Sequence, residues 1–253
     1  MTVYVNAPST SKAFKNLDEV IYIVVDTFRA TTSLVTLKKA GVKRIYVVQN
    51  EIEARKLQQE MLPNGILIGE KGGLKIEGFD YGNTPSLFHN LDFNNKEIIF
   101  TSTSGAKAIT ALNPSKQIFI GSLVNLTSIS DIATEIAMSK QKDVCVVPAG
   151  YSLNEEEYVL EDWVTGLLIA EKISINLQTT IESENKFLKK TQKILEENKN
   201  LKDLLSKAPN ALYLDGLGFK EDVDFAISID KINNFLKVKK WLHVNEIDCV
   251  ALE

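Results

Sequence analysis

The chain has 253 residues, a formal net charge of -4, and hydrophobic and charged fractions of 44% and 25%, which are ordinary for a globular protein. The slight acidic excess argues against binding of nucleic acid or of an anionic membrane, since both favour basic surfaces. Two cysteines give neither a disulfide framework nor zinc-ligand spacing. No apolar run reaches the roughly 18 residues of a membrane span, and the N-terminus lacks the pattern of a signal peptide. We therefore expect a protein of the reducing cytoplasm.

Strand-like runs alternate with helical stretches over the first two thirds of the chain. The apolar, β-branched run 19–26 predicts a buried strand, and the spacing of apolar residues after it predicts a helix that stops at Gly41. A second strand at 44–48 precedes a helix that Asn50 would cap. Further strands are expected in the runs GILIGE, EIIFTSTSG, KQIFIGS and DVCVVPAG, and further helices at 106–112, 126–139 and 160–173.

This alternation predicts a largely parallel sheet with helices on both faces. The region 180–207 is rich in Lys, Glu and Asn with spaced apolar residues, which predicts one or two amphipathic helices lying over the sheet as a solvated surface. After it, 224–229 and 248–252 again read as strands. There is no internal repeat or low-complexity linker. The expected fold class is therefore α/β, layered α/β/α, with a largely parallel or mixed sheet and residues 1–253 in a single unit of one or two lobes.

Hydroxyls, glycines and a few charges follow the predicted strands, at the edge where open parallel sheets bind ligands. Asp26 ends the first buried strand, and Arg29 follows at a helix start with a guanidinium fork that suits a phosphate or another acid group. Glycines and helix N-termini bring backbone N–H groups to an oxyanion. The candidate phosphate-binding residues are Thr31, Thr32, Thr101, Ser102, Thr103, Ser104, Gly105 and Ser122.

Carboxylates and amides stand near the same edge of the predicted sheet. Magnesium ions prefer carboxylate, water and phosphate oxygens, so the candidate Mg²⁺ ligands are Asp26, Glu70, Asp80, Glu161 and Asp162. Asn83 and Asn125 are candidates for orienting a substrate. The alternative for each serine or threonine is a helix cap, and for the turn-rich segment 78–85 it is a structural loop.

Several phosphate-handling chemistries are excluded by missing motifs. There is no G-x-x-x-x-G-K-[ST] loop. Tyr151 stands six residues after Cys145, where a cysteine phosphatase needs an arginine. The two histidines, His89 and His243, are far apart, which disfavours phosphohistidine chemistry. The residue two positions after Asp26 is not a second aspartate, so an aspartyl-phosphate route of the dehalogenase type is unsupported. The groups that remain for catalysis and binding are carboxylates, amides, hydroxyls and one arginine.

Taken together, the motifs resemble the 2-phosphosulfolactate phosphatase family. The resemblance implies a layered α/β/α fold and Mg²⁺-dependent hydrolysis of (R)-2-phospho-3-sulfolactate to sulfolactate and phosphate, a step of coenzyme M biosynthesis. It also implies a small phosphorylated acid as the substrate, while a homodimer is the base-rate expectation for assembly. The segments that carry the resemblance are VVDTFRATTS (24–33), GE (69–70), GFDYGNTP (78–85), TSTSGA (101–106), GSLVN (121–125), AG (149–150), LEDWVTG (160–166) and the tail 217–234.

The chain departs from the family pattern at three single positions and in the region 207–214, which lacks the Gly-Arg element expected there. Ser104 and Ala106 stand where an Asn and a Thr are expected, and Lys71 replaces an Arg, which exchanges a bidentate fork for a point charge that would meet the sulfonate or the carboxylate. Water attack aided by a carboxylate is favoured over covalent attack by Asp26. Two alternatives stay open: a phosphatase of another small 2-phospho acid, such as phospholactate or phosphoglycolate, and an oxyanion-binding protein without turnover.

Overall fold

The computed structural model of the protein describes residues 1–6, 19–112, 117–150 and 158–253. Residue 116, at the start of one predicted strand, lies outside these ranges. The strands are β1 (Val3–Val5), β2 (Val20–Val25), β3 (Arg44–Val47), β4 (Ile66–Lys71), β5 (Leu74–Lys75), β6 (Glu97–Thr101), β7 (Ile118–Gly121), β8 (Asp143–Pro148), β9 (Ile181–Glu182), β10 (Leu236–Val244) and β11 (Ile247–Leu252). The helices are α1 (Ala30–Lys39), α2 (Glu51–Glu60), α3 (Pro85–Phe88), α4 (Gly105–Thr110), the 3-10 turn η2 (Leu123–Asn125), α5 (Leu126–Lys140), α6 (Leu160–Leu177), α7 (Phe187–Glu197), α8 (Leu201–Ser206), α9 (Pro209–Gly216) and α10 (Lys220–Ala226).

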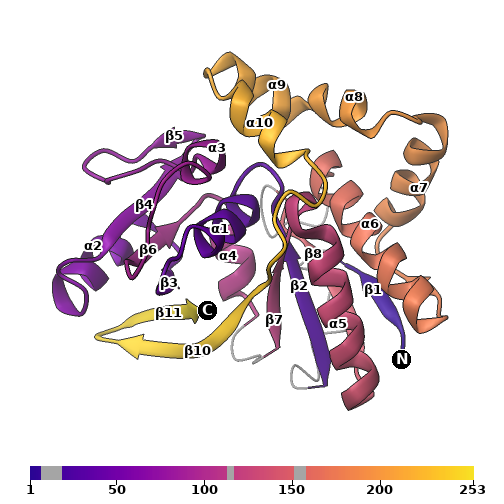
Figure 1. Ribbon diagram of the computed structural model, residues 1–253, viewed down its shortest axis with the longest axis horizontal. Helices are drawn as coiled ribbons and strands as arrows, with labels where there is room; N and C mark the ends of the chain where they lie inside the picture. The colour runs from indigo at the N-terminus through magenta and orange to yellow at the C-terminus, as the bar shows by residue number, and fades with distance from the viewer. Residues whose placement is uncertain (7–18, 113–116, 151–157) are drawn as a thin grey trace.

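Eleven strands of the described ranges form one mixed sheet in the order β5-β4-β6-β3-β11-β10-β7-β2-β8-β1-β9. Strands β4, β6 and β3 form one parallel block, and β7, β2, β8, β1 and β9 form a second. The C-terminal hairpin β10–β11 joins the blocks by antiparallel pairing with β7 and β3 (Figure 1). The predicted α/β class with a largely parallel sheet is confirmed.

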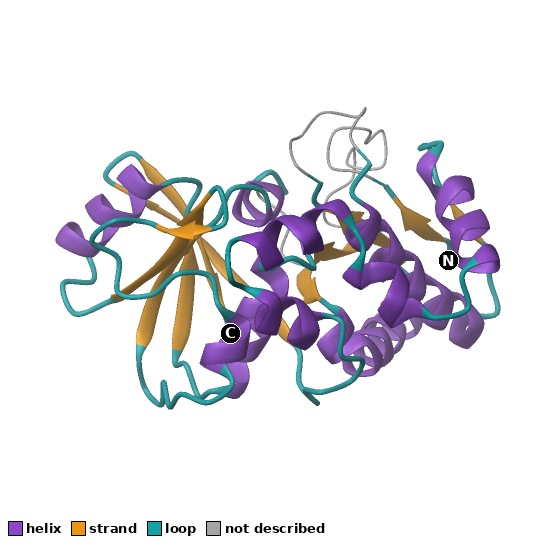
Figure 2. Ribbon diagram, turned by 90° about the horizontal axis from the view of Figure 1, so that it is seen from above, coloured by secondary structure: helices purple, strands orange, loops and turns teal. Residues whose placement is uncertain are grey.

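Alternate residues of the central strand β2 face opposite helix layers. Tyr22 and Val24 pack in the core beneath α1, α3, α4 and α10, whereas Ile21 and Ile23 pack against α5, α6 and α7. On the other block, α2 covers the face opposite to α1 and α4. Figure 2 shows helices on both sides of the strands. A strand buried on both faces is apolar at every position, which is why the sequence of β2 could be recognised as a strand.

The segment 224–229 is a correction, because it was predicted as a strand and forms the end of α10 followed by a turn. Its apolar alternation is misleading, since Ile229 is 51% exposed while Val223 and Ala226 are buried one helical turn apart. The preceding residues favour a helix, with Lys220 paired to Asp224 at helical spacing.

The central hairpin β10–β11 was only half predicted, since β11 was expected and β10 was not. Strand β10 begins with the pattern of a half-buried strand, in which Leu236 and Val238 are buried and Lys237 is exposed. Asn245 and Glu246 connect the two strands with positive φ angles of 44° and 67°, as in the tight turns that match the strand twist.

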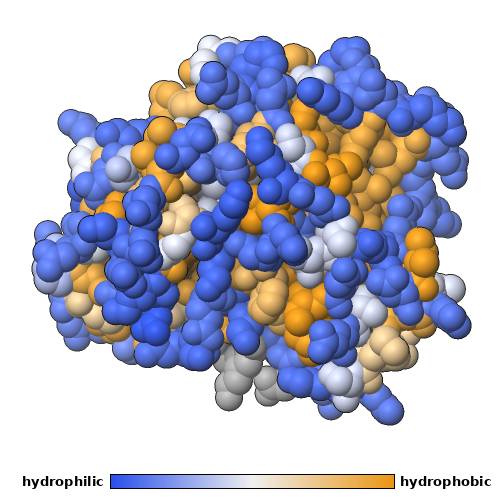
Figure 3. Space-filling model, viewed as in Figure 1, coloured by the Kyte–Doolittle hydropathy of each residue, from blue (hydrophilic) through white to orange (hydrophobic). Residues whose placement is uncertain are grey.

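The predicted amphipathic helices of 180–207 are α7 and α8. Helix α7 buries Phe187 and Leu188 mainly against α6, which itself covers the sheet, so it forms an outer layer rather than lying on the strands. Hydrophilic residues line the outer edge of the molecule where α7 lies (Figure 3). These helices therefore have the solvated outer face that the sequence predicted.

Two further sequence predictions concern thiols and membranes. Cys145 and Cys249 are both buried free thiols, and burial raises their pKa values to about 12 and about 11, which makes them unreactive. In the described ranges, no helix combines the length and apolarity needed to cross a bilayer.

Candidate active site

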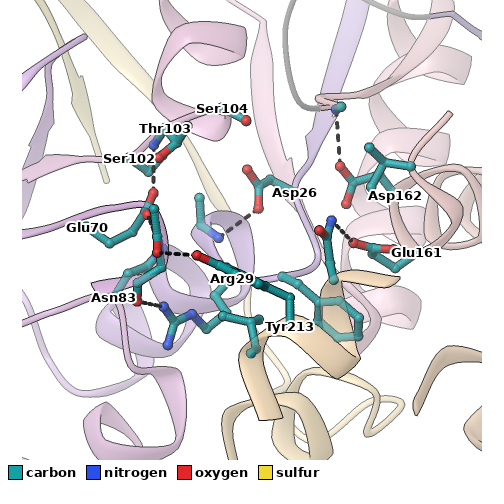
Figure 4. Close-up of a pocket in the computed structure, with 18 residues that line it drawn as sticks. Asp26, Arg29, Glu70, Asn83, Ser102, Thr103, Ser104, Glu161, Asp162 and Tyr213 are labelled. Atoms are coloured by element: carbon teal, nitrogen blue, oxygen red, sulfur yellow. Dashed lines mark hydrogen bonds between the residues drawn. The ribbon is translucent and has the colours of Figure 1, made fainter. Parts of the chain in front are cut away.

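A cavity of about 190 Å³ lies where the carboxyl ends of β2, β4 and β6 meet the N-terminus of α6 (Figure 4). Asp26 occupies the middle of this site, between Glu70 on one side and the pair Glu161 and Asp162 on the other. The predicted site residues that line the cavity are Asp26, Arg29, Glu70, Asn83, Ser102, Thr103, Ser104, Glu161 and Asp162. The cavity is also lined by Asn210, Tyr213 and Leu214 of α9, which the sequence analysis did not single out.

Asp26 is held by the turn between β2 and α1. Its Oδ1 atom accepts the backbone N–H of Ala30 at 3.0 Å, and Thr31 closes the turn with two hydrogen bonds to the backbone of Asp26. Burial, followed by repulsion from Glu70, raises the pKa of Asp26 to about 6 against the stabilising N–H of Ala30. Thr31 shapes the turn that carries Asp26 and does not itself line the cavity.

Glu161 and Asp162 are brought to Asp26 by Thr27, the next residue of the turn. The Thr27 N–H donates to Asp162 at 2.8 Å and its hydroxyl donates to the Glu161 carbonyl at 3.2 Å. Burial, and then the charge of Asp26, raises the pKa of Glu161 to about 7, although Asn210 donates to its carboxylate at 2.6 Å. Burial and the charges of Asp26 and Glu161 raise the pKa of Asp162 well above its usual range.

In their ionised form these three buried carboxylates have no counter-charge, since none of them forms a salt bridge within the described part of the chain. No three His, Cys, Asp or Glu side chains of the described residues converge as a ready-made metal cage. Magnesium ions are often held by one or two carboxylates together with water and substrate phosphate oxygens. The donor set of Asp26, Glu161 and Asp162 therefore fits such an ion in charge and in ligand type.

Arg29 lines the cavity, but its guanidinium is already held by protein groups. Its Nη1 atom donates to Asp222 at 2.8 Å, its Nη2 atom donates to the Gly73 carbonyl, and the ring of Phe219 lies 4.3 Å from the guanidinium carbon. The charge of Arg29 is thus paired before a ligand arrives. A free phosphate fork, which the sequence suggested, is not what the structure presents.

Glu70 and Asn83 lie on the same side of the cavity, but the oxygens of Glu70 accept hydrogen bonds whereas the side-chain oxygen of Asn83 accepts none from the described residues (Figure 4). The carboxylate of Glu70 accepts the backbone N–H groups of Thr103 at 2.7 Å and Gly73 at 2.8 Å, so it joins the β4–β5 turn to the loop before α4. The Oδ1 atom of Asn83 is buried and has no hydrogen-bond partner in the described part of the chain. Glu70 therefore joins two loops of the site, as Asp162 does through the N–H groups of Thr27 and Gly150, whereas Asn83 has an acceptor without a partner among the described residues.

Comparison with known proteins identifies the family. The family model described as 2-phosphosulpholactate phosphatase matches residues 6–240 of the 253-residue chain. The chain belongs to this family. A protein named "Probable 2-phosphosulfolactate phosphatase" from Caldanaerobacter subterraneus subsp. tengcongensis is 31% identical over 231 residues, which cover 90% of this chain and 91% of that protein. The "2-phosphosulfolactate phosphatase" of Methanocaldococcus jannaschii is 28% identical over 229 residues, covering 87% of this chain and 90% of that protein.

The structure places several predicted site residues of this 2-phosphosulpholactate phosphatase family member outside the cavity lining. The hydroxyl of Thr32 contacts that of Ser122 at 2.7 Å, and Asn125 accepts the Ser122 N–H at 2.9 Å in a capping box. Asp80 is exposed and accepts the Leu67 N–H at 2.8 Å. These contacts match the alternatives given in the sequence analysis, a helix cap for Ser122 and a structural loop for the segment that contains Asp80. The predicted residues outside the lining are Thr31, Thr32, Lys71, Asp80, Thr101, Gly105, Ser122 and Asn125.

The residues that sequence reasoning missed come from the C-terminal helices α9 and α10. Asn210 contacts Glu161, the Tyr213 hydroxyl donates to the Gly72 carbonyl at 3.1 Å, and Asp222 pairs with Arg29. The only sequence signal was the resemblance of the tail 217–234 to the family. The position of α9 and α10 in the chain does not indicate that α9 lines the cavity or that α10 packs beside it.

Gly105 does not line the cavity but permits the approach of α4 to Asp26. A Cβ atom at residue 105 would lie 2.5 Å from the Ala30 Cβ and 2.8 Å from Asp26 Oδ2. We expect Gly105→Ala to lower kcat at least about tenfold, because the clash displaces Asp26 from a packed site. Steady-state kinetics checks this, with Gly216→Ala as control because a Cβ there meets nothing within 4 Å. Equal kcat in both variants would contradict the role of Gly105.

Asn125 is expected to matter for folding rather than for turnover. Its side chain caps η2 and donates to the carbonyls of Ile120 and Asn234 at 3.3 and 3.2 Å. We expect Asn125→Ala to lower the free energy of unfolding by about 1–3 kcal/mol, since buried partners lose their hydrogen bonds. Denaturant unfolding measures this loss, while KM per folded enzyme stays within about twofold of the wild type. A large rise in KM would restore Asn125 as a substrate contact.

Proposed function

We propose that the protein is a Mg²⁺-dependent phosphoric monoester hydrolase that cleaves (R)-2-phospho-3-sulfolactate to 3-sulfolactate and phosphate. Family membership supports the reaction class, and the names of the relatives support the substrate. The observation that carries the metal dependence is the buried cluster of Asp26, Glu161 and Asp162, whose charges have no salt-bridge partner among the described residues. Such a cluster is stable in its ionised form only with a cation.

Asp26 and one or both of Glu161 and Asp162 would hold the ion. When bound, Mg²⁺ supplies charge neutralisation for the phosphoryl oxygens. Phosphoryl transfer needs little else from the protein besides positioning and stabilisation of charge. Arg29 has N–H donors beyond its two protein hydrogen bonds, Asn83 has a buried oxygen without a partner among the described residues, and both residues line the cavity. Both act on the substrate in this proposal.

The attacking water gives up its proton to a carboxylate of the cavity. With Asp26 and Asp162 on the ion, Glu161 is suited to this role because it lines the cavity, is buried, and has its carboxylate oriented by Asn210. Glu70 is less suited, because both of its oxygens already accept backbone N–H groups. Water attack therefore requires no covalent intermediate on Asp26.

A second candidate substrate class is favoured by the sparse positive charge around the cavity. Among the described lining residues Arg29 is the one cation, and it is already paired with Asp222. Lys71, which the sequence suggested for the sulfonate, is exposed and does not line the cavity. A substrate without a sulfonate, such as phospholactate or phosphoglycolate, carries less negative charge and so needs fewer cationic side chains in the cavity lining.

Phosphate release from 2-phosphosulfolactate, 2-phospholactate and phosphoglycolate, each with Mg²⁺ and with EDTA, tests both candidates. Mg²⁺-dependent release with the highest kcat/KM for phosphosulfolactate supports the first proposal. A higher kcat/KM for one of the other acids supports the second. Release from none of the three by folded protein would refute the phosphatase proposal and favour an oxyanion-binding role.

We further propose a cytoplasmic location and a small phosphorylated acid as the binding partner. The two free, buried thiols fit a reducing compartment. The acidic net charge of -4 fits a protein that does not bind nucleic acid.

A further inference from the structure

Helix α9 forms one wall of the active-site cavity, and α10 packs against α9 without contributing a residue to the described lining. Asn210 and Tyr213 of α9 line the cavity, and α10 packs against α3 and α9 (Figure 1). This C-terminal arm, residues 209–226, therefore contacts segments that follow three different strands. Within this arm, the buried carboxylate of Asp222 contacts both Arg29, which lines the cavity, and Ser86.

Asp222 connects two segments that carry candidate substrate-binding residues. Its Oδ2 atom accepts from Arg29 Nη1 at 2.8 Å, and both side chains are 2% exposed. Its Oδ1 atom accepts the backbone N–H and the hydroxyl of Ser86 at 3.0 and 2.6 Å. The carboxylate of α10 therefore holds the turn before α1 and the first residues of α3 at the same time.

The contact with Asp222 fixes the plane of the Arg29 guanidinium. The Gly73 carbonyl accepts from Nη2, and the Phe219 ring lies against one face. Two of the five N–H donors of the guanidinium are used in these bonds, which leaves the others for the cavity that Arg29 lines. A shift of Asp222 would change which donors face the cavity.

The contact with Ser86 bears on Asn83 three residues earlier. Asn83 is 2% exposed, lines the cavity, and has an Oδ1 atom without a partner in the described part of the chain. An unsatisfied buried acceptor costs about 1–3 kcal/mol, so its persistence at a cavity wall points to a ligand donor. Fixing Ser86 fixes the short segment that presents this acceptor.

We propose that Asp222 is a positioning residue for the reaction. It orients Arg29 toward the cavity and, through Ser86, orients the segment that presents Asn83. The inference rests on the proposed phosphatase function, because its first readout is turnover. The competing explanation is that the buried Arg29–Asp222 pair only stabilises the fold, since breaking such a pair is costly in itself.

Asp222→Glu tests the proposal without removing the charge. The added methylene moves the carboxylate while the ion pair with Arg29 persists, so the variant keeps a compensated buried charge. We expect kcat per folded enzyme to fall about 10²-fold, as for a displacement of roughly 1 Å at a catalytic group, and KM to rise by no more than about tenfold. A purely structural role would lower the folded fraction and leave kcat per folded enzyme unchanged.

Asp230 supplies a matched control in the same part of the chain. Its carboxylate also accepts one backbone N–H and one hydroxyl, both from Thr127, at 2.7 and 2.6 Å. Asp230 does not line the cavity. We expect kcat of Asp230→Glu to stay within about twofold of the wild type, because the change leaves the cavity groups in place.

A double-mutant cycle with Arg29 separates positioning from general damage. Asp222→Asn keeps an acceptor for Ser86 but removes the charge that holds Arg29. In an Arg29→Met background the guanidinium is already absent, so Asp222→Asn cannot displace it further. We expect the double variant to have the kcat/KM of Arg29→Met alone, within about threefold, as for residues that act as a unit. Losses that multiply, or a wild-type kcat in Asp222→Glu, would overturn the proposal. If Asp222→Asn does not fold, Asp222→Glu carries the test.

Binding of inorganic phosphate, measured by calorimetry, separates this inference from the proposed function. A wild type that releases no phosphate from any substrate refutes the phosphatase, but it can still bind phosphate in the cavity. In that case Asp222→Glu is expected to weaken phosphate binding about tenfold, the equivalent of about 1.4 kcal/mol, while Asp230→Glu does not. Equal phosphate affinity in the wild type and Asp222→Glu, or no phosphate binding by the wild type, would overturn the role of Asp222.

Discussion

Replacing Asp26 by asparagine is expected to lower kcat about 10³-fold, the loss typical of removing a central electrostatic group from an active site. Asp26 stands in the middle of the cavity, and its carboxylate is a proposed ligand of the ion that neutralises the phosphoryl group. The amide keeps an oxygen that accepts the Ala30 N–H, so the turn survives. Phosphate release under saturating substrate, per folded enzyme, measures the effect.

The same substitution is expected to stabilise the metal-free protein. Because burial raises the pKa of Asp26 from 3.8 to about 6, the ionised side chain destabilises the folded state at pH 8. A neutral amide removes a cost of roughly 1–3 kcal/mol, which denaturant unfolding in EDTA would measure. Low activity combined with higher stability is the signature of a functional charge. Low activity with lower stability would instead indicate that Asp26 supports the fold.

Asp80→Asn is the matched control for Asp26→Asn. Asp80 was also predicted as a metal ligand, but it is exposed and accepts a backbone N–H of β4 outside the cavity lining. We expect its kcat to stay within about twofold of the wild type. A loss as large as that of Asp26→Asn would mean that the cavity described here is not the active site.

The metal-free protein is expected to lose stability as the pH rises from about 4 to about 8. The pKa values of Asp26 and Glu161 are raised from 3.8 to about 6 and from 4.5 to about 7, so the folded state binds protons more tightly than the unfolded state. Stability is therefore fully present below the unfolded pKa values and is lost as the pH rises through the folded ones. The contribution of Asp26 alone is about 3 kcal/mol.

Magnesium ions are expected to reverse this loss above pH 7. An ion that binds the ionised carboxylates of the folded state at about 100 times its Kd adds about 2.7 kcal/mol, or roughly 5–10 °C in Tm for a chain of this size. Thermal unfolding from pH 4 to 8, with Mg²⁺ and with EDTA, measures both effects. In Asp26→Asn, both the fall of Tm with rising pH in EDTA and the gain of Tm from Mg²⁺ should be smaller than in the wild type. A Tm that is independent of Mg²⁺ at pH 8 would contradict the proposed metal site.

Much of the fold was predictable because its local patterns agree with the global structure. The run that forms β2 is apolar at every position, as burial on both faces requires, and α2 begins at Asn50, whose side chain accepts the Glu53 N–H at 3.0 Å. The pattern failed at 224–229, where apolar alternation coincided with the end of a helix. Strand β10 was also missed, although its start shows the alternation of a half-buried strand. What has no local signal is its pairing with β7 and β11, which joins the two parallel blocks.

The candidate site was predictable only in part, for a comparable reason. Residues that follow parallel strands share an edge of the sheet, so the sequence correctly brought Asp26, Glu70 and the loop 102–104 together. A position after a strand does not show which way a side chain points. Ser122 and Asn125 follow β7 and yet cap a helix away from the cavity lining.

The sequence by itself determined the α/β class and the carboxylate and hydroxyl chemistry of one sheet edge, because these depend on periodicity and on residue type near strand ends. Its motifs also carried the resemblance to the family. Only the tertiary structure decided which candidates share a cavity and in which direction burial shifts their pKa values. Burial raised the pKa values of Asp26, Glu161 and Asp162, and α10 brought Asp222 to Arg29. Both effects depend on contacts between segments far apart in the chain, and such contacts leave no periodic signal in the sequence.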